Sequence, residues 1–336
     1  MSSTTVAGTA TPPSTSRSVR ILRRHGWTIG VFLLLIALVF YWRGQTTLKW
    51  GPFDVQSLAI DALPLCFAAC GQAIVILSGG IDLSIGSMMA LVNVVSARVM
   101  LHMSFRDAVL SSIVIVLGAA LVGAAIGLTI VVTRVADIIV TLAMLFVLGG
   151  LALAVLEVPG GGAPTRYQNL VTLDTVLTHW LPSALVILFG AYTLMWLTVR
   201  RTRVGLALYA IGSNRNAAYL AGVNVPATRV LAYAYSGAFG ALGGLALTAA
   251  SGLGDPNAGG IYTLNSVAAV VLGGVSLLGG VGGLIGPICA AFVLTLVKTV
   301  LILRGVDQNY AQVIQGALIV LVVMIGGLVV RQKGKS

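Results

Sequence analysis

The sequence predicts an all-α polytopic membrane protein with about ten transmembrane helices. Only 9% of its 336 residues are charged and 58% are hydrophobic, which leaves too few charges to solvate a soluble protein of this size. The mean hydropathy is +1.01, and residues 256–297 contain no charged side chain. Lipid must therefore contact most of the surface. A helix suits this solvent because its backbone hydrogen bonds are satisfied internally.

Ten apolar runs are candidate spans, since a helix needs about 20 mostly apolar residues to cross the hydrocarbon. In chain order they are 27–42, 56–77, 84–101, 108–132, 138–157, 176–199, 228–250, 263–281, 285–303 and 310–330. The runs 84–101 and 285–303 are the weakest, because a glycine-rich break adjoins each of them. The spans define a membrane domain at 26–330 that contains a loop at 200–229, with a disordered tail at 1–25 and a short tail at 331–336.

Basic residues predict the orientation, because Lys and Arg accumulate in cytoplasmic loops. Four arginines precede the first span, and counting spans from there places most other basic clusters on the same side: Arg134, Arg200, Arg201, Arg203, Arg215, Arg331, Lys333 and Lys335. The opposite side receives only scattered basic residues. Both termini are therefore expected to be cytoplasmic, and the net charge of +11 indicates orientation rather than nucleic-acid binding.

Glycine pairs at small-xxx-small spacing occur inside the spans, at Gly123–Gly127 and Gly240–Gly244. This spacing lets helix backbones approach closely in lipid. It predicts a tightly packed bundle and says nothing about substrate.

The sequence contains no pattern typical of an enzyme, a metal site or a cofactor site. Cys66, Cys70 and Cys289 are expected to be small apolar residues in helix interfaces, and the three histidines are dispersed. The C-terminal Gly334-Lys335-Ser336 imitates a phosphate-binding loop, but that loop needs a glycine where Val329 stands and a helix afterwards. We therefore expect no catalytic residue, no metal and no nucleotide bound by this chain.

The segment 78–87 is the first candidate functional site. Gly79, Gly80, Ser84 and Gly86 surround Asp82 between the second and third spans. A carboxylate at the bilayer centre costs roughly 2.5–3.5 kcal/mol on insertion scales, so we expect Asp82 at a water-accessible break, where it caps the following helix. The alternative is a turn with no contact to substrate.

Further polar residues lie within the predicted spans, and such groups are pathway candidates by default. Asp61 precedes Pro64 in a span that the proline can bend, and Asn93 lies in the third span. The others are Gln72, Glu157, Lys298, Gln312 and Gln315. Hydrogen bonding between helices is the alternative explanation, above all for Gln and Asn.

The loop 200–229 is the longest hydrophilic segment inside the chain. Its pattern predicts two short amphipathic helices joined at Gly212-Ser213-Asn214. The apolar run from Ala217 to Leu220 would be unnecessary in a merely solvated loop. We therefore expect a surface on which another protein docks.

The residues around the first break have a partial counterpart later in the chain. Residues 74–87 can be laid without gaps over 268–281, which places Gly79-Gly80 on Gly273-Gly274 and Asp82 on Ser276. Duplicated halves with glycine-interrupted segments are frequent in transporters. The match is either chance in a glycine-rich chain or an internal duplication, and counting spans gives both copies the same orientation.

Three segments carry a resemblance to a known family: GGIDLSIGS at 79–87, GSNRNAAYLAGVNV at 212–225 and SVAAVVLGGVSLLGGVGGLIG at 266–286. They resemble the permease subunits of ATP-binding-cassette (ABC) importers for monosaccharides such as ribose, xylose, arabinose and galactose, with relatives for autoinducer-type sugars and polyols. The three motifs stand in the expected order, and the resemblance extends from Leu58 to Met324.

The resemblance implies a pathway formed by two permeases in the bacterial inner membrane, two cytoplasmic ATPases and a periplasmic sugar-binding protein. It assigns five residues to the loop that docks into the ATPase: Gly212, Asn214, Ala217, Ala218 and Gly222. An ion-coupled secondary sugar transporter is the alternative function, with Asp61, Asp82 and Glu157 as available carboxylates. That alternative, like a channel or a scaffolding subunit, leaves the 200–229 loop unexplained.

Overall fold

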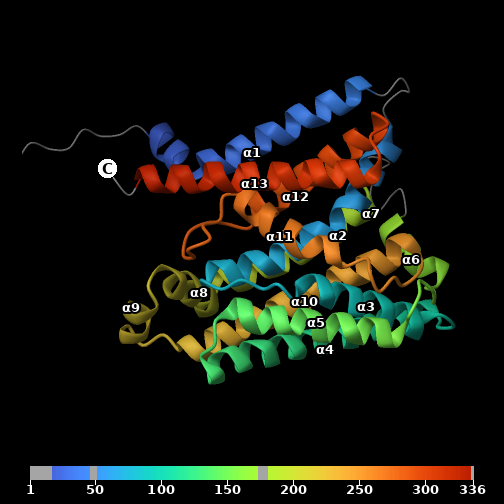
Figure 1. Ribbon diagram of the computed structural model, residues 1–336, viewed down its shortest axis with the longest axis horizontal. Helices are drawn as coiled ribbons and strands as arrows, with labels where there is room; N and C mark the ends of the chain where they lie inside the picture. Colours follow the sequence, from blue (N-terminus) through green and yellow to red (C-terminus); the bar gives the residue numbers. More distant parts are fainter. Residues whose placement is uncertain (1–16, 46–50, 173–180, 334–336) are drawn as a thin grey trace, which may run out of the picture.

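The computed structural model describes the backbone of residues 17–45, 51–172 and 181–333, and this part of the chain is helical without any β-strand. Its helices, labelled in Figure 1, are α1 Arg17–Gln45, α2 Pro52–Leu77, α3 Ile85–Met100, α4 Phe105–Thr133, α5 Asp137–Val155, α6 Thr165–Thr172, α7 Ser183–Arg201, α8 Arg203–Ser213, α9 Arg215–Leu220, α10 Val225–Ser251, α11 Gly260–Leu272, α12 Ile285–Leu303 and α13 Gln308–Lys333. The predicted all-α class is confirmed. Of the disordered tail expected at 1–25, residues 1–16 lie outside the described residues, whereas residues 17–25 belong to helix α1.

Six helices of the described part are long and apolar enough to cross a membrane: residues 26–44 of α1, and α2, α4, α5, α10 and α12. Three shorter apolar helices accompany them, namely α3, residues 183–194 of α7, and α11. These helices support a chain with several membrane spans, but they do not confirm the predicted number of about ten spans. The predicted span 310–330 falls in α13, only part of whose side chains is described.

Most predicted boundaries agree with the helices to within a few residues, apart from the start of α1 and the end of the span predicted at 263–281. Its helix, α11, ends at Leu272. The helix stops there because Gly274 adopts a left-handed conformation (φ 84°), which a continuing α-helix cannot contain. The short helix α6 was not predicted at all, and the start of the span predicted at 176–199 lies outside the described residues.

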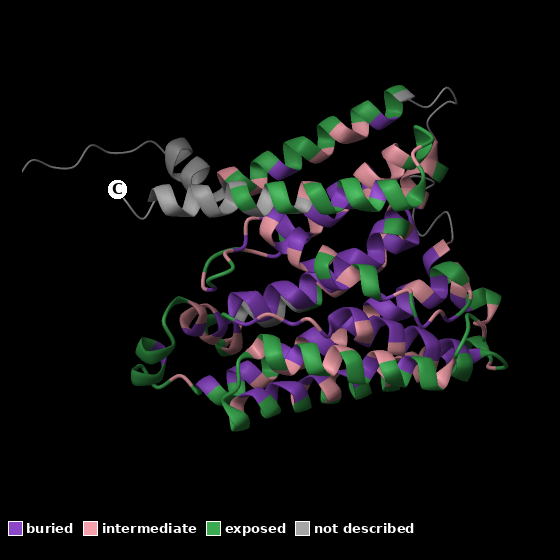
Figure 2. Cartoon of the chain, viewed as in Figure 1, coloured by how far each residue is buried: buried purple, intermediate pink, exposed green. Residues whose placement is uncertain are grey.

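Helices α2 and α10 form the centre of the bundle. Figure 2 shows α2 almost entirely buried and α10 mostly buried, while α1, α4 and α5 expose much of their outward sides. In its most apolar stretch, α2 has 89% of its residues buried, against 28% for α4 and 17% for α5. The exposed faces of α4 and α5 are themselves apolar, as expected of helices that contact lipid.

Glycine allows α4 and α10 to pack closely against each other. A Cβ atom added to Gly127 would lie 2.9 Å from the Cα of Val230, and one added to Gly123 would meet the backbone of Tyr233. The predicted small-xxx-small pair thus allows backbone-to-backbone packing. The cysteines also match expectation, since Cys66, Cys70 and Cys289 are buried and free.

Helices α2 and α11 end in the same way, which bears on the internal repeat. After α2, the N–H of Gly79 donates to Ile76 O (2.9 Å) and that of Gly80 to Val75 O (3.0 Å). After α11, the N–H groups of Gly274 and Val275 make the equivalent bonds at 2.9 and 3.1 Å. Both turns place a glycine in the left-handed region, Gly79 at φ 81° and Gly274 at φ 84°.

This shared geometry changes the alignment of the two segments. Gly79 corresponds to Gly274 rather than to Gly273, so the ungapped match is shifted by one residue at this turn. The second break is also longer, because it runs over residues 273–284 whereas the first occupies 78–84.

Candidate functional site

Asp82 lies in the first break, buried and fully engaged by hydrogen-bond donors. Its Oδ1 accepts from the N–H of Ser84 (2.9 Å) and from the Ser84 hydroxyl (2.6 Å). Its Oδ2 accepts from the hydroxyl of Ser236 in α10 (2.6 Å). With its amide oriented to hydrogen-bond, Gln72 of α2 also pairs with the backbone of Asp82. Through these hydrogen bonds the carboxylate connects the break to α10 and to the residue just before α3.

Asp82 does not cap α3 as expected, because the amide that it binds belongs to Ser84, the residue just before the helix. Burying a carboxylate is costly unless donors replace the lost water. Three protein donors do so here. Asp82 is exposed by only 3%, so its side chain shapes the break and does not face an open path.

An ion pair that was not predicted lies next to this break. Arg229 of α10 pairs with Asp137, the first residue of α5. The Tyr233 hydroxyl donates to the other oxygen of Asp137 (2.8 Å). A Cβ atom added to Gly80 would lie 2.5 Å from that same carboxylate oxygen, so only glycine leaves room for the pair. Asp137 and Arg229 stand 92 positions apart in the sequence, and no local pattern connects them.

Gly86 lets α3 approach the start of α11. A Cβ atom added to Gly86 would lie 2.6 Å from the carbonyl oxygen of Gly259 and against the hydroxyl of Thr263. The break is thus enclosed on three sides, by α10, by α5 and by α11.

The loop 200–229 forms the two predicted short helices, α8 and α9, which meet at Asn214. The Asn214 side chain accepts from the N–H of Ala217 (3.0 Å) and caps α9. Gly222 ends α9 in a left-handed turn (φ 82°). The small size of Ala218 has an internal reason, because this residue is 4% exposed and packs with Ile211 and Val225.

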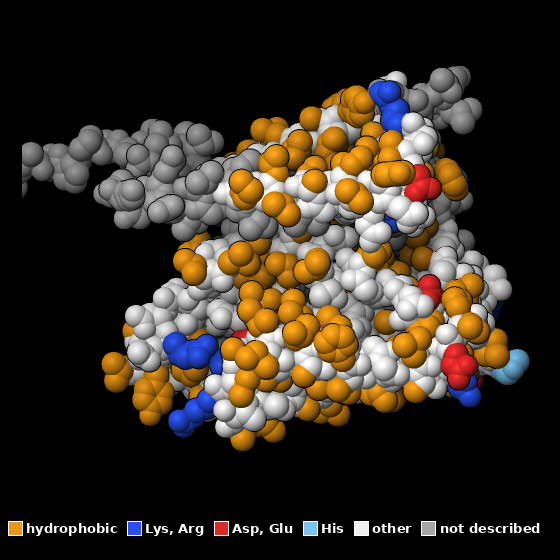
Figure 3. Space-filling model, viewed as in Figure 1, with side chains coloured by type: hydrophobic (Ala, Val, Ile, Leu, Met, Phe, Trp, Pro, Cys, Tyr) orange, Lys and Arg blue, Asp and Glu red, His pale blue; other side chains and the backbone are white. Residues whose placement is uncertain are grey.

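Three large apolar side chains of this loop are exposed. Leu206, Tyr219 and Leu220 are exposed by 72%, 70% and 84%. They lie at one end of the molecule, where Figure 3 shows Lys and Arg side chains beside hydrophobic ones, while the middle of the molecule carries a mainly hydrophobic band. Large apolar side chains at a charged end are typical of a protein-binding surface.

The two remaining pathway candidates differ in their surroundings. Asn93 is buried, donates to the Thr248 hydroxyl (2.8 Å) and accepts from the N–H of Asp255 (2.6 Å), so its amide joins α3 to the end of α10. Asp61 is exposed on α2 and interacts electrostatically with Lys298 of α12 and with Tyr262 of α11. Of the two, only Asp61 remains accessible to a passing molecule.

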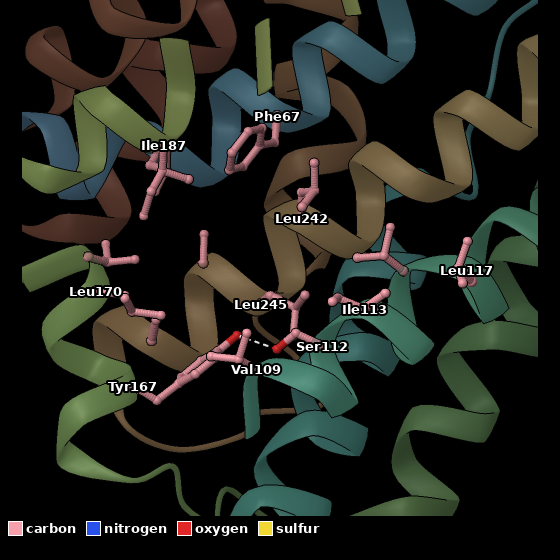
Figure 4. Close-up of a pocket in the computed structure, with 15 residues that line it drawn as sticks. Phe67, Val109, Ser112, Ile113, Leu117, Tyr167, Leu170, Ile187, Leu242 and Leu245 are labelled. Atoms are coloured by element: carbon pink, nitrogen blue, oxygen red, sulfur yellow. Dashed lines mark hydrogen bonds between the residues drawn. The ribbon is translucent and has the colours of Figure 1, made fainter. Parts of the chain in front are cut away.

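An apolar cavity of about 390 Å³ lies between α2, α4, α6, α7 and α10 (Figure 4). Its polar lining groups include the hydroxyls of Ser112 and Tyr167, which share a hydrogen bond of 2.9 Å. The rest of the lining is almost entirely aliphatic or aromatic, as at Phe67, Leu170 and Leu245. A polyhydroxylated ligand needs several polar partners in its site, so this cavity does not suit one.

Residues 55–323 match the family described as "Branched-chain amino acid transport system / permease component". The ribose import permease protein RbsC of Escherichia coli (strain K12) is 32% identical over 279 residues, which cover 81% of this chain and 83% of the relative. RbsC of Bacillus subtilis (strain 168) is 32% identical over 307 residues, covering 91% and 93%. The galactose/methyl galactoside import permease protein MglC of E. coli (strain K12) is 28% identical over 323 residues, covering 91% and 94%. No solved structure matches the chain.

Proposed function

The chain belongs to this family of transport-system permease components, and we propose on that premise that it carries a monosaccharide or related polyol across the bacterial inner membrane. It is the permease subunit of an ABC importer and not itself an enzyme, because ATP hydrolysis takes place on a partner subunit. The resemblance identified from three sequence segments is confirmed. The names of the relatives favour a sugar over an amino acid as the cargo.

The surface of the α8–α9 loop is the proposed docking site for the ATPase. Leu206, Tyr219 and Leu220 are apolar and exposed although the loop is hydrophilic overall, which is best explained by a protein partner. A periplasmic binding protein delivers the sugar, and a second permease copy or homologue completes the pathway. Asp61 is our candidate for contact with the passing sugar, since Asp82 and Asn93 are occupied by internal hydrogen bonds.

The proposed orientation places both termini and the α8–α9 loop in the cytoplasm, following the excess of Arg and Lys at these points. Alkaline phosphatase is active only outside the cytoplasm. A fusion after Lys335 should therefore be inactive and a fusion within 158–175 active. An active fusion at the C-terminus would overturn this topology.

The function is tested by reconstituting the chain with its ATPase and binding protein in proteoliposomes. We expect ATP-dependent uptake of at least one labelled pentose, hexose or polyol, and none of leucine. Uptake of leucine would show that the cargo is a branched-chain amino acid, as in the family description, and not a sugar. Uptake that follows a proton or sodium gradient without any ATPase would favour the secondary transporter instead.

A further inference from the structure

Near the end of α2, three segments that are distant in the sequence contact one another through their backbone atoms. The N–H of Gly280, in the loop after α11, donates to the carbonyl oxygen of Leu77 (3.0 Å). A Cβ atom added to Gly279 would lie 3.0 Å from the Cα of Gly79 and 3.0 Å from the Cα of Gly212 in α8. We call Gly79, Gly212, Gly279 and Gly280 the glycine junction. Figure 1 shows α8 beside the loop that follows α11.

Gly212 occupies the centre of this junction. A Cβ atom there would overlap the Leu77 carbonyl oxygen and the Gly280 nitrogen, and would lie 3.1 Å from the Gly280 Cα. One helical turn earlier, the Tyr209 hydroxyl donates to the carbonyl oxygen of Gly282 (3.0 Å). Helix α8 therefore touches the first break and the second break at the same time.

Three of the four glycines of the junction have a backbone conformation that residues with side chains rarely adopt. Gly79, Gly279 and Gly280 have φ values of 81°, 86° and 69°, all in the left-handed region. Contacts between side chains can absorb a small displacement by changing rotamer. Contacts between backbones have no such freedom, so a shift of α8 must move the segments that it touches.

We propose that Gly212 is the positioning residue through which the α8–α9 loop acts on both breaks together. This proposal rests on the proposed function, in which the ATPase binds that loop. Ile211, Ala218 and Val225 pack against one another, so α8, α9 and the start of α10 move as one unit. A displacement imposed on Leu220 by the partner then reaches Leu77 and Gly280 through Gly212.

The test is Gly212→Ala in the assembled importer, with Gly118→Ala as the matched control, because a Cβ atom at Gly118 meets no atom within 4 Å. We expect Gly212→Ala to retain the ATPase through purification and to retain ATP hydrolysis. Sugar transported per ATP hydrolysed should fall by about tenfold, in the range that packed coupling residues produce. The control should keep the native ratio.

A ratio that stays native in Gly212→Ala would overturn the proposal, and so would an equal fall in Gly118→Ala. Loss of the ATPase from Gly212→Ala would also overturn it, by showing that the junction positions the docking surface instead. Failure of the proposed function would give a different result, because the native chain itself would then not bind an ATPase.

If Gly212→Ala does not fold, a milder variant still tests the proposal. Tyr209→Phe removes the hydroxyl that donates to Gly282 and preserves the ring. We expect it to assemble with the ATPase and to lower the sugar transported per ATP by about threefold. An unchanged ratio in Tyr209→Phe would contradict a coupling role for the contact of α8 with the second break.

Discussion

Replacing Leu220 by aspartate should abolish both ATPase co-purification and ATP-driven sugar uptake, while the purified chain stays as stable as before. Leu220 is exposed by 84%, so it contributes little to packing within the chain. If it docks into an apolar cleft of the ATPase, the new carboxylate is buried without a partner. That costs about 3–5 kcal/mol, and at about 1.4 kcal/mol per factor of ten the contact weakens more than a hundredfold.

Two companion variants make this result specific. Leu220→Met preserves an apolar side chain of similar size and should co-purify with the ATPase as the native chain does. Ala218→Glu should destabilise the loop itself, because Ala218 is buried against Ile211 and Val225. Normal co-purification of Leu220→Asp would show that the ATPase binds elsewhere.

Replacing Arg229 by methionine should lower the free energy of unfolding by about 3–5 kcal/mol, because it leaves the Asp137 carboxylate buried without its counter-charge. The side chains of both residues are largely buried, at 9% and 16% exposure. Loss of the pair also loosens Tyr233, which donates to the same carboxylate beside Gly80. Thermal unfolding in detergent, followed by circular dichroism, measures the change.

The double variant separates the pair from its surroundings. With Asp137→Leu and Arg229→Met together, no charge is left unpaired. The total loss should therefore be smaller than the sum of the two single losses. Additive losses would show that Asp137 and Arg229 stabilise the fold independently, in spite of their contact.

The local features of this fold could be predicted from the sequence because they depend on neighbouring residues. Apolar runs predicted α3, α5 and α12 to within two residues at each end, and the polar pattern of 200–229 predicted both α8 and α9. Glycines next to Asp82 indicated a break. The early end of α11 was missed, since an apolar run that contains Gly273-Gly274 has the composition of a continuing span.

The tertiary features could not be predicted, because they join residues that no local pattern relates. The pairing of Asp137 with Arg229 depends on how α5 lies on α10. The inward direction of Ala218 depends on the angle between α8 and α10. For the same reason the sequence placed Gly212 in the loop but could not predict its contact with Leu77 and Gly280.

The three buried cysteines have a practical consequence for labelling chemistry. Cys66, Cys70 and Cys289 are free, exposed by no more than 9% and enclosed between helices. A maleimide or a nitroxide reagent cannot reach their sulfur atoms while the chain is folded. Spin or fluorescent labels can therefore be attached to single cysteines introduced on α9 outside the proposed docking surface, at Asn216 for example, without first removing the native thiols. Distances from such labels would report the position of the loop at each stage of the ATP cycle.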